Sequence, residues 1–447
     1  MSKKLIIPKQ IVTADAEDKI YRNYSIEIEE GIIKSIAKVD EDKISKYYGE
    51  VLRYPNLTLV PGFVQTHIHT CQTLFRGLAD DLELLDWLTM KIFPYENSHN
   101  KESLRASVKL SLLELQGGGT TTVMDMGTMR HQEVIFDEFI KNGMRGYCGK
   151  CMIDENELYP DFKETTKESL SESYQLAKEF HNSAEGRIKY GFAPRFVLSC
   201  SEELMKETHS MLGDFEDSIF HTHSSENKSE IEAVRKKYGK ENIEYFNSIG
   251  VLDDHTVLAH CIHLNNSEID SLKTTQARVA HCPSSNLKLG SGIAQIPRYL
   301  NEGIQVSLGA DGAPCNNNLS VFTEMRLAAL IQKPVHGPTS TNAKTIFRLG
   351  TIEGAKALHL DNEVGSIEVG KKADLVLLNL ESSSHSLPDD DENIYSNIVY
   401  SSSPQDVEHV MINGGWVVVG GKSINLDEEE VVADAKEELL KLLKRSE

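Results

Sequence analysis

Cysteine is scarce in this sequence, with seven residues among 447. An odd and sparse count is typical of reduced thiols and argues against a disulfide framework. The only C-x-x-C pair is Cys148 and Cys151, in the strand-like stretch RGYCGKCMID, where residues three apart face opposite sides. The spacing therefore predicts that both thiols pack in the core and take no part in redox or zinc chemistry.

Long hydrophobic runs and basic blocks are also missing. The N-terminal stretch MSKKLIIPKQIVTADAEDK has no long apolar core and no small-residue cleavage site, and no later run approaches the length of a membrane span. The formal net charge of −21 and the pI near 5.3 argue against a nucleic-acid or membrane partner. The sequence thus predicts a cytoplasmic protein that acts on a small-molecule substrate.

What the sequence does contain is one unit repeated along its middle. Short apolar or β-branched runs alternate with amphipathic helical stretches from about residue 58 to residue 335, which is typical of parallel β/α units. The strand candidates are residues 57–65, 120–126, 145–153, 188–196, 218–225, 256–264, 277–285 and 305–313. Helical stretches, with apolar residues three and four apart, include residues 131–143, 168–182, 202–214 and 321–332. Eight such units predict an α/β fold, a TIM-like (β/α)8 barrel.

The two ends of the chain differ from this middle. Alternating patterns such as YSIEIEEGIIKSIAK and VEHVMINGGWVVVGGK predict that residues 1–57 and 361–447 pair into one small β-sandwich domain, beside a barrel of residues 58–360. The last stretch, DEEEVVADAKEELLKLLKRSE, has acids first and bases last, which favours a helix. The run LPDDDEN is expected to be a solvated loop.

Histidines gather where the predicted strands end. The stretch VPGFVQTHIHTCQTLFRG places His67 and His69 at alternate positions, so both imidazoles face one side of a strand. His223, His260 and Asp311 end the fifth, sixth and eighth strand candidates, and the carboxyl ends of barrel strands converge on one mouth. Three imidazoles and one carboxylate suit a divalent ion with a water completing its coordination. Zinc is the first expectation and iron(II) the second.

Glu226 follows His223 by three residues, in HTHSSEN, where a strand gives way to a loop. A carboxylate beside a metal-bound water can take a proton and pass it to a substrate. His260 is either a further ligand or a residue that orients the attacking oxygen, and we favour the second because four ligands are already present. His221 shares a face with His223 one layer deeper, so it is expected to pack there or to support a ligand.

Five motifs occur in order along the chain: PGFVQTHIHT, HTHSSE, AHCIHL, HCPSSNLKLGSG and SLGADGAPCNNNLSVFTEMRLAALIQK, with VGSIEVGKKADLVLLNL near the end. Together they resemble the amidohydrolase superfamily over essentially the whole chain, specifically its mononuclear-metal aminohydrolase branch. That branch includes deaminases of 5'-deoxyadenosine, of 5'-methylthioadenosine and S-adenosylhomocysteine, and of guanine, and the s-triazine hydrolases. The resemblance implies a homo-oligomeric hydrolase that acts on C–N bonds of cyclic amidines.

The resemblance also implies a role for each matched residue. The metal ligands are His67, His69, His223 and Asp311, and the catalytic residues are Glu226, His260 and Asp311, with Glu226 as the proton shuttle. Binuclear relatives bridge two metals with a carbamylated lysine at the end of strand four, whereas this strand ends with Arg195. A single divalent metal is therefore implied.

The candidate substrate-binding residues are Gln72, Trp87, Lys150, Arg195 and Phe196. Gln72 can hydrogen-bond a ring edge, Trp87 can stack on a base or sugar, and Arg195 at the mouth needs an anionic or carbonyl partner. The pair Arg195-Phe196 with Gln72 is similar to guanine deaminases. S-Adenosylhomocysteine deaminases usually carry a histidine in place of Arg195 and an arginine in place of Lys150, and this chain departs from them at both positions.

The expected reaction is the hydrolytic deamination of a 5'-modified adenosine, because TLFRGLADDLELLDWL and the stretch around Asp311 resemble the adenosine-analogue and triazine members. Guanine deamination or s-triazine hydrolysis is the alternative. A cyclic amide hydrolase would share the metal chemistry but would open a ring instead of releasing ammonia. A non-catalytic metal-binding scaffold is also conceivable, but it has no need of Glu226 and Asp311 around one open metal position.

Overall fold

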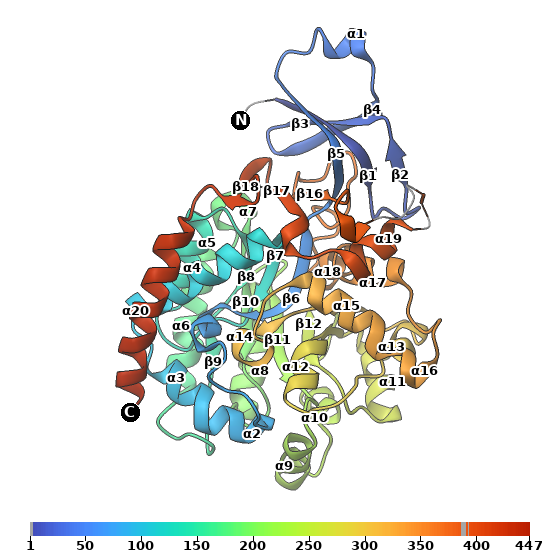
Figure 1. Cartoon of the computed structure of the whole chain (residues 1–447). Helices are drawn as coiled ribbons and strands as arrows, with labels where there is room; N and C mark the ends of the chain where they lie inside the picture. The colour runs from blue at the N-terminus through green and yellow to red at the C-terminus, as the bar shows by residue number, and fades with distance from the viewer. Residues whose placement is uncertain (1–2, 386–389, 392) are drawn as a thin grey trace.

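The computed structural model describes residues 3–385, 390–391 and 393–447, so residues 387–389 and 392 of the run LPDDDEN lie outside the described residues. The chain forms a barrel and a mixed sheet that contains strands from both chain ends (Figure 1). The barrel strands are β6 (Phe63–His69), β7 (Thr120–Asp125), β8 (Arg145–Cys148), β9 (Cys151–Met152), β10 (Ile188–Pro194), β11 (Ile219–Ser224), β12 (Thr256–His260), β13 (Arg278–His281), β14 (Val306–Leu308) and β15 (Asp311–Gly312).

Parallel pairing closes these strands into a ring. Within the described residues the order is β14, β13, β12, β11, β10, β8, β7, β6 and β15, with β9 beside β10. β14 and β15 are two segments of the eighth strand: β14 pairs with β13, and β15 pairs with β6, where Asp311 lies opposite Ile68. The hydroxyls of Thr66 and Ser307 are 2.7 Å apart and join the first and eighth strands inside the barrel. The predicted TIM-like barrel is confirmed.

The first barrel strand differs from its predicted extent of 57–65. Residues 57–61 belong to β5 of the mixed sheet, and the barrel strand begins at Phe63. The break falls at Gly62, whose N–H bonds to the carbonyl of Asp374. A Cβ there would lie 2.1 Å from Thr121 Oγ1, so only glycine lets the chain pass from one sheet to the other.

The mixed sheet joins the two ends of the chain. Its strands are β1 (Lys4–Val12), β2 (Ile20–Arg22), β3 (Tyr24–Glu29), β4 (Ile32–Lys38), β5 (Glu50–Pro61), β16 (Leu375–Asn379), β17 (Val407–Ile412), β18 (Gly415–Val419) and β19 (Lys422–Ser423). β5 is parallel to β1 and antiparallel to β16, with Leu59 opposite Leu377. A buried bidentate ion pair between Arg145 and Asp374, at 2.7 and 3.1 Å, fastens this sheet to the barrel. The predicted pairing of strands from the two chain ends is therefore confirmed, in one mixed sheet.

Helices cover the barrel, and the helical stretches predicted from the sequence are confirmed. The helices are α1 (Glu41–Ile44), α2 (Leu84–Trp87), α3 (Phe93–Asn97), α4 (Lys101–Gly117), α5 (Glu133–Lys141), α6 (Thr166–Phe180), α7 (Ser183–Gly186), α8 (Glu202–Ser210), α9 (Lys228–Tyr238), α10 (Asn242–Ile249), α11 (Asn266–Thr275), α12 (Pro283–Lys288), α13 (Ile296–Asn301), α14 (Ala313–Asn316), α15 (Val321–Ile331), α16 (Lys333–His336), α17 (Ala343–Leu349), α18 (Ile352–Ala357), α19 (Ile394–Ser396) and α20 (Glu428–Ser446). The 3-10 helices are η1 (Thr70–Phe75), η3 (Met211–Asp214), η4 (Ser383–His385) and η6 (Pro404–Asp406), and the π-helices are η2 (Leu88–Ile92) and η5 (Asn397–Ser401). The C-terminal helix α20 packs along α4 (Figure 1). None of the described helices is long and apolar enough to cross a membrane.

The cysteines lie in the interior as unpaired thiols. Cys148 ends β8 and Cys151 begins β9, and both are buried and free. Burial raises the pKa of the Cys148 thiol well above its usual value and that of Cys151 to about 11. The predicted core packing of this C-x-x-C pair is therefore confirmed.

Candidate metal centre and active site

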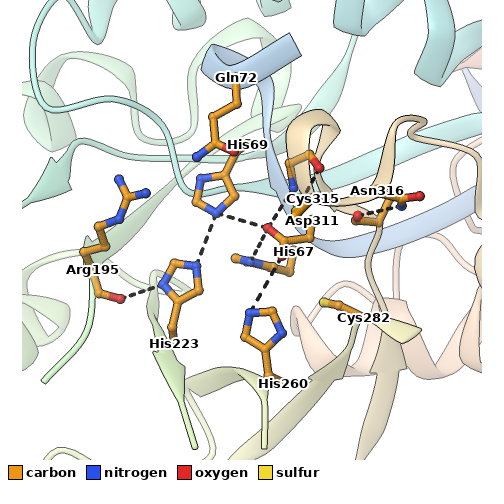
Figure 2. A network of polar contacts seen from close by, with 12 residues as sticks. His67, His69, Gln72, Arg195, His223, His260, Cys282, Asp311, Cys315 and Asn316 are labelled. Carbon is orange, nitrogen blue, oxygen red and sulfur yellow. Dashed lines mark hydrogen bonds and ion pairs between the residues drawn. The ribbon is translucent and has the colours of Figure 1, made fainter. Parts of the chain in front are cut away.

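Four side chains meet at the carboxyl end of the barrel. His67 and His69 come from the end of β6, His223 from the end of β11, and Asp311 from the start of β15, and Figure 2 shows the imidazoles turned toward the carboxylate. Asp311 Oδ1 lies 3.2 Å from His67 Nε2 and 3.4 Å from His69 Nε2. The Nε2 atoms of His69 and His223 are 3.2 Å apart. The structure thus brings the four predicted ligands together.

These distances fit one divalent ion. Ligand atoms at about 2.0–2.2 Å from a tetrahedral zinc lie about 3.3–3.6 Å from one another, close to the separations measured here. A potential ligand atom of each of the four residues lies within 4.8 Å of the others. His67 Nε2 is buried and has no hydrogen-bond partner among the described residues, so its lone pair is left for a cation. Three nitrogens and one oxygen are donors that zinc and iron(II) accept.

Hydrogen bonds behind the cluster fix the tautomers of two ligands. The carbonyl of Val257 accepts from His221 Nδ1 at 3.0 Å, so His221 Nε2 accepts in turn from His67 Nδ1 at 2.7 Å. His223 donates its Nδ1–H to the carbonyl of Arg195 at 2.7 Å. Both arrangements leave Nε2 of the ligand unprotonated and facing the cluster. His221 therefore supports a ligand from the layer below, one of the two places that its sequence position allowed.

Burial sets the protonation states of the cluster. It lowers the pKa of His67, and it lowers the pKa of His69 and His223 well below the usual value of histidine, helped by the neighbouring imidazoles. Burial alone would raise the pKa of Asp311, but the surrounding imidazoles, His67 first, hold it well below its usual value. Neutral imidazoles and an ionised carboxylate are the forms that bind a cation.

Glu226 and His260 lie beside this cluster. His260 Nε2 is 3.4 Å from Glu226 Oε2 and 3.8 Å from Asp311 Oδ2. Asn286 Oδ1 accepts from His260 Nδ1 at 2.9 Å and so orients the ring. Burial, followed by the charges of Asp311 and Glu230, raises the pKa of Glu226 well above its usual value. Glu226 therefore accepts a proton more readily than Asp311, which rests in the ionised form.

Backbone strain concentrates at the same strand ends. His260 and Cys261 have φ values of 73° and 47°, Ser225 has 53°, and Asp311 has 63°, although none is glycine. Such left-handed residues cost of order 1 kcal/mol each and persist where the surrounding structure fixes them, commonly at functional sites. The strain therefore falls on His260 and Asp311 of the site and on Ser225 and Cys261, which adjoin Glu226 and His260 in the chain.

A cavity opens directly over the cluster. It is partly enclosed and lined on one side by apolar and on the other by polar side chains. Its apolar wall consists of Leu84, Trp87, Leu88, Phe196 and Leu289, and its polar wall of His69, Gln72, Arg195, His223, Glu226, Glu230, His260 and Asp311. Four of the five predicted substrate contacts therefore lie on one cavity together with the candidate catalytic residues.

Arg195 forms an ion pair with a carboxylate of the same chain. Its guanidinium bonds bidentately to the carboxylate of Glu96 in α3, at 2.7 and 3.1 Å, and lies 5.1 Å from the centre of the Phe93 ring. Gln72 Nε2 donates to the same carboxylate at 2.7 Å, while Gln72 Oε1 has no hydrogen-bond partner among the described residues. Arg195 and Glu96 are almost fully buried, so each charge depends on the other.

Lys150 lies elsewhere. Its ammonium is buried and bonds to the carboxylates of Glu164 and Glu172, at 3.1 and 3.0 Å, and to the carbonyl of Met129. Lys150 is not among the residues that line the cavity over the cluster. The structure therefore does not bring it together with the other four candidates, and its contact with substrate stays a prediction.

Three residues of the site escaped the sequence reasoning. Glu96 pairs with Arg195, Asn286 orients His260, and Glu230 accepts the backbone N–H of Glu226 at 2.8 Å. Asn286 lies inside the motif HCPSSNLKLGSG, so its place in that motif was an available signal. No motif or spacing in the sequence around Glu96 indicates this pair, because Glu96 comes close to Arg195 only through the path of the chain after the first strand.

A TIM-like barrel whose mouth gathers three imidazoles, an ionised carboxylate and a glutamate of raised pKa defines a metal-dependent hydrolase. The sequence profile of the Amidohydrolase family matches residues 58–417, and the chain belongs to this family.

Relatives agree with that placement. The chain is 38% identical to a 5'-deoxyadenosine deaminase of Methanococcus maripaludis, over 93% of this chain and 96% of the relative. It is 35% identical to a 5-methylthioadenosine/S-adenosylhomocysteine deaminase of Moorella thermoacetica, over 86% of this chain and 87% of the relative. Its structure is similar to that of a zinc-bound adenosine deaminase from Xanthomonas campestris, with a TM-score of 0.91 and 26% identity over 99% and 98% of the two chains. The predicted resemblance is confirmed.

Proposed function

We propose that this protein is a metal-dependent hydrolytic deaminase of 5'-modified adenosines, with 5'-deoxyadenosine and 5'-methylthioadenosine as its best substrates. The carrying observation is the mouth of the barrel, where a set of three imidazoles and one carboxylate lies beside a buried glutamate of raised pKa. The curated relatives, each matched over most of its length, support the substrate class. The products are the inosine analogue and ammonia.

One divalent ion, Zn²⁺ first and Fe²⁺ second, would be held by His67, His69, His223 and Asp311. When bound, such an ion lowers the pKa of a water toward neutrality and so prepares it for attack. The fit rests on the spacing of the donors and on their protonation states.

The chain's own residues move the protons. Glu226 takes a proton from the attacking water and gives it to the ring nitrogen beside the amino-bearing carbon, as the water oxygen adds to that carbon. Asp311 takes the second proton from that oxygen and delivers it to the amino nitrogen, whereupon the carbon–nitrogen bond breaks and ammonia leaves. His260 directs Nε2 at the space between these two carboxyl groups, which suits it to orient the attacking oxygen.

The charges of the cavity favour an uncharged 5' group. Arg195 is the only lysine or arginine among the lining residues, and Glu96 already neutralises it. Lys150 is neutralised by Glu164 and Glu172. A homocysteine carboxylate on the substrate would therefore meet no free cation, while the apolar wall with Trp87 suits a base and a small 5' group. We thus place S-adenosylhomocysteine below 5'-methylthioadenosine as a substrate.

Guanine is the second candidate. The unpaired Oε1 of Gln72, together with Arg195 and Phe196 on the same cavity, offers polar groups that could read a purine edge without a ribose. An s-triazine or a cyclic amide would use the same metal and the same proton carriers.

We further propose that the protein works in the cytoplasm as a homo-oligomer. All seven cysteines are free thiols, which agrees with a reducing compartment. Light scattering coupled to size-exclusion chromatography measures the number of chains directly, and a monomer at working concentration would rule out the oligomer.

The test is the ultraviolet absorbance of purified, zinc-loaded protein with 5'-deoxyadenosine, which follows conversion of the adenine chromophore to hypoxanthine. We expect conversion that stops on chelation, and a higher kcat/KM for 5'-methylthioadenosine than for S-adenosylhomocysteine. Inactivity with all three, combined with ammonia release from guanine or an s-triazine, would replace the adenosine proposal with the second candidate. Ring opening of an amide without ammonia release would remove the deaminase class.

A further inference from the structure

The side chain of Glu226 is poorly held by its own contacts. It follows Ser225, a residue with φ of 53°, in the turn between β11 and α9. Glu226 Oε1 has no hydrogen-bond partner among the described residues, and Oε2 has only His260 Nε2 at 3.4 Å. A carboxyl group that must reach a ring nitrogen needs a fixed position, because a misplacement of 1 Å can cost about 10²-fold in rate.

The position of Glu226 is fixed through backbone hydrogen bonds that are accepted by Glu230. This glutamate is 1% exposed, and its Oε2 accepts the backbone N–H of Glu226 at 2.8 Å and that of Asn227 at 3.3 Å. Its Oε1 accepts from the side chain of Asn242, the first residue of α10. Asn227 caps α9, and its Oδ1 accepts the backbone N–H of Ser229 at 3.0 Å. The turn is thus tied at consecutive amides to two helices.

We propose that Glu230 is a positioning residue for the deamination, which holds the backbone of Glu226 so that its carboxyl group faces His260 and Asp311. The inference rests on the proposed function for its catalytic meaning. Bonds from backbone N–H groups to a carboxylate are among the stronger hydrogen bonds, and their acceptor is buried here, so the turn has little freedom while Glu230 is in place.

The chain contains a matched control in Glu268. Asn265 caps α11 as Asn227 caps α9, and Glu268 stands at the third helical position as Glu230 does. Glu268 is 2% exposed and accepts the N–H groups of Asn265 at 2.9 Å and Ile243 at 3.2 Å, so it too contacts the start of α10. Glu268 does not line the cavity. The residue before the cap Asn265 is Leu264, whereas the residue before the cap Asn227 is Glu226.

The experiment compares Glu230→Ala, Glu230→Gln and Glu268→Ala with the zinc-loaded wild type, on the substrate that the wild type deaminates. We expect Glu230→Ala to lower kcat by about 10²-fold with KM little changed. Glu230→Gln should recover most of the rate, because the amide oxygen can accept both N–H groups and Asn242 can turn its amide over to meet the new NH₂. Glu268→Ala should keep kcat within about threefold, although it loses the same kind of cap.

Hydrogen exchange of the peptide that covers residues 224–229 supplies a readout that needs no substrate. Glu230→Ala should accelerate exchange there, and Glu268→Ala should not. Normal kcat in Glu230→Ala, or equal losses in both alanine variants, would overturn the inference while leaving the proposed function intact. A wild type that deaminates nothing would overturn the proposed function, and the exchange data would then show whether the anchoring itself exists. If Glu230→Ala does not fold, Glu230→Asp, which withdraws the carboxylate by one methylene, carries the same expectations.

Discussion

Among the residues that the structure describes, two groups of histidine and aspartate have a spacing that could hold a metal ion, and they lie near opposite ends of β12. The mouth cluster consists of His67, His69, His223 and Asp311, and the base cluster of Asp254, His255 and His359. Ring distances alone would not separate them, because the imidazoles of His255 and His359 stack with centroids 4.1 Å apart. Burial and hydrogen bonding do separate them.

The polar atoms of the base cluster are satisfied by hydrogen bonds or by water, without a cation. His359 Nε2 donates to the carbonyl of Asp254 at 2.8 Å, His255 Nδ1 donates to the carbonyl of Ser218 at 3.0 Å, and the Asp254 side chain is 48% exposed to water. Burial, followed by the positive charge of Arg278, lowers the pKa of His359, and that same charge would repel a metal ion. At the mouth, the Asp311 side chain is 7% exposed and buried imidazole nitrogens lack partners. Ligand spacing therefore predicts a metal centre only where desolvated donors are left unsatisfied.

The strongest test of the difference between the two clusters is to neutralise one aspartate in each. We expect Asp311→Asn to lose metal and to lower kcat/KM by more than about 10⁴-fold, because one change removes both a ligand and a proton carrier. Asp254→Asn should leave metal content and rate unchanged and shift stability by no more than about 0.5 kcal/mol. Elemental analysis together with the absorbance assay measures both. Metal loss in Asp254→Asn would make the base cluster a true site.

A second variant separates holding the metal from moving the proton. Glu226→Gln should lower kcat by about 10²- to 10⁴-fold while the metal content stays at the wild-type level, since Glu226 is not a ligand. The measurement is steady-state ammonia release alongside elemental analysis of the same sample. A near-normal rate would remove Glu226 from the mechanism, and a loss of metal would make it part of the mouth cluster.

The contrast between buried and exposed charge extends to the cavity wall. Glu96→Ala leaves the guanidinium of Arg195 buried without a partner, so we expect the free energy of unfolding to fall by about 3–5 kcal/mol. The control is Glu155→Ala, which breaks the exposed ion pair to Lys237 at 2.6 Å and should cost no more than about 1 kcal/mol. Chemical denaturation at constant metal concentration measures the two. Equal losses would mean that Arg195 regains a partner from solvent or from a shifted side chain.

The mouth cluster was predictable from the sequence because its information is local. Alternation within one strand brings His67 and His69 to the same face, and the parallel barrel brings the ends of the fifth and eighth strands to the same mouth. The repeated β/α pattern predicted the barrel for the same reason. Strand ends were less predictable. The first barrel strand begins at Phe63, because the crowding of Gly62 against Thr121 exists only in the folded chain, and the sixth and seventh strands end at His260 and His281, before their predicted ends.

The partners of these residues were not predictable. Glu96 meets Arg195 across 99 positions of the sequence, and Asn286 meets His260 across 26. Each contact depends on where a loop returns over the barrel, and no periodicity encodes that path. The sequence therefore identified Arg195 as a cation that needs an anionic partner, but it did not indicate that this partner is Glu96 of the same chain.

The loss of stability on chelation tests where the metal binds, and we expect it to be smaller than the loss in Glu96→Ala. With free zinc at about 100 times its dissociation constant, binding to the native state alone adds about 2.7 kcal/mol to the free energy of unfolding, and chelation removes it. Calorimetric unfolding with and without chelator should show this loss in full in the wild type and in His359→Gln, because the base cluster holds no ion. Asp311→Asn should show almost none, because the mouth cluster is already broken. A reduced loss in His359→Gln would mean that part of the metal sits at the base, and that half-exposed donors with carbonyl partners can still bind it.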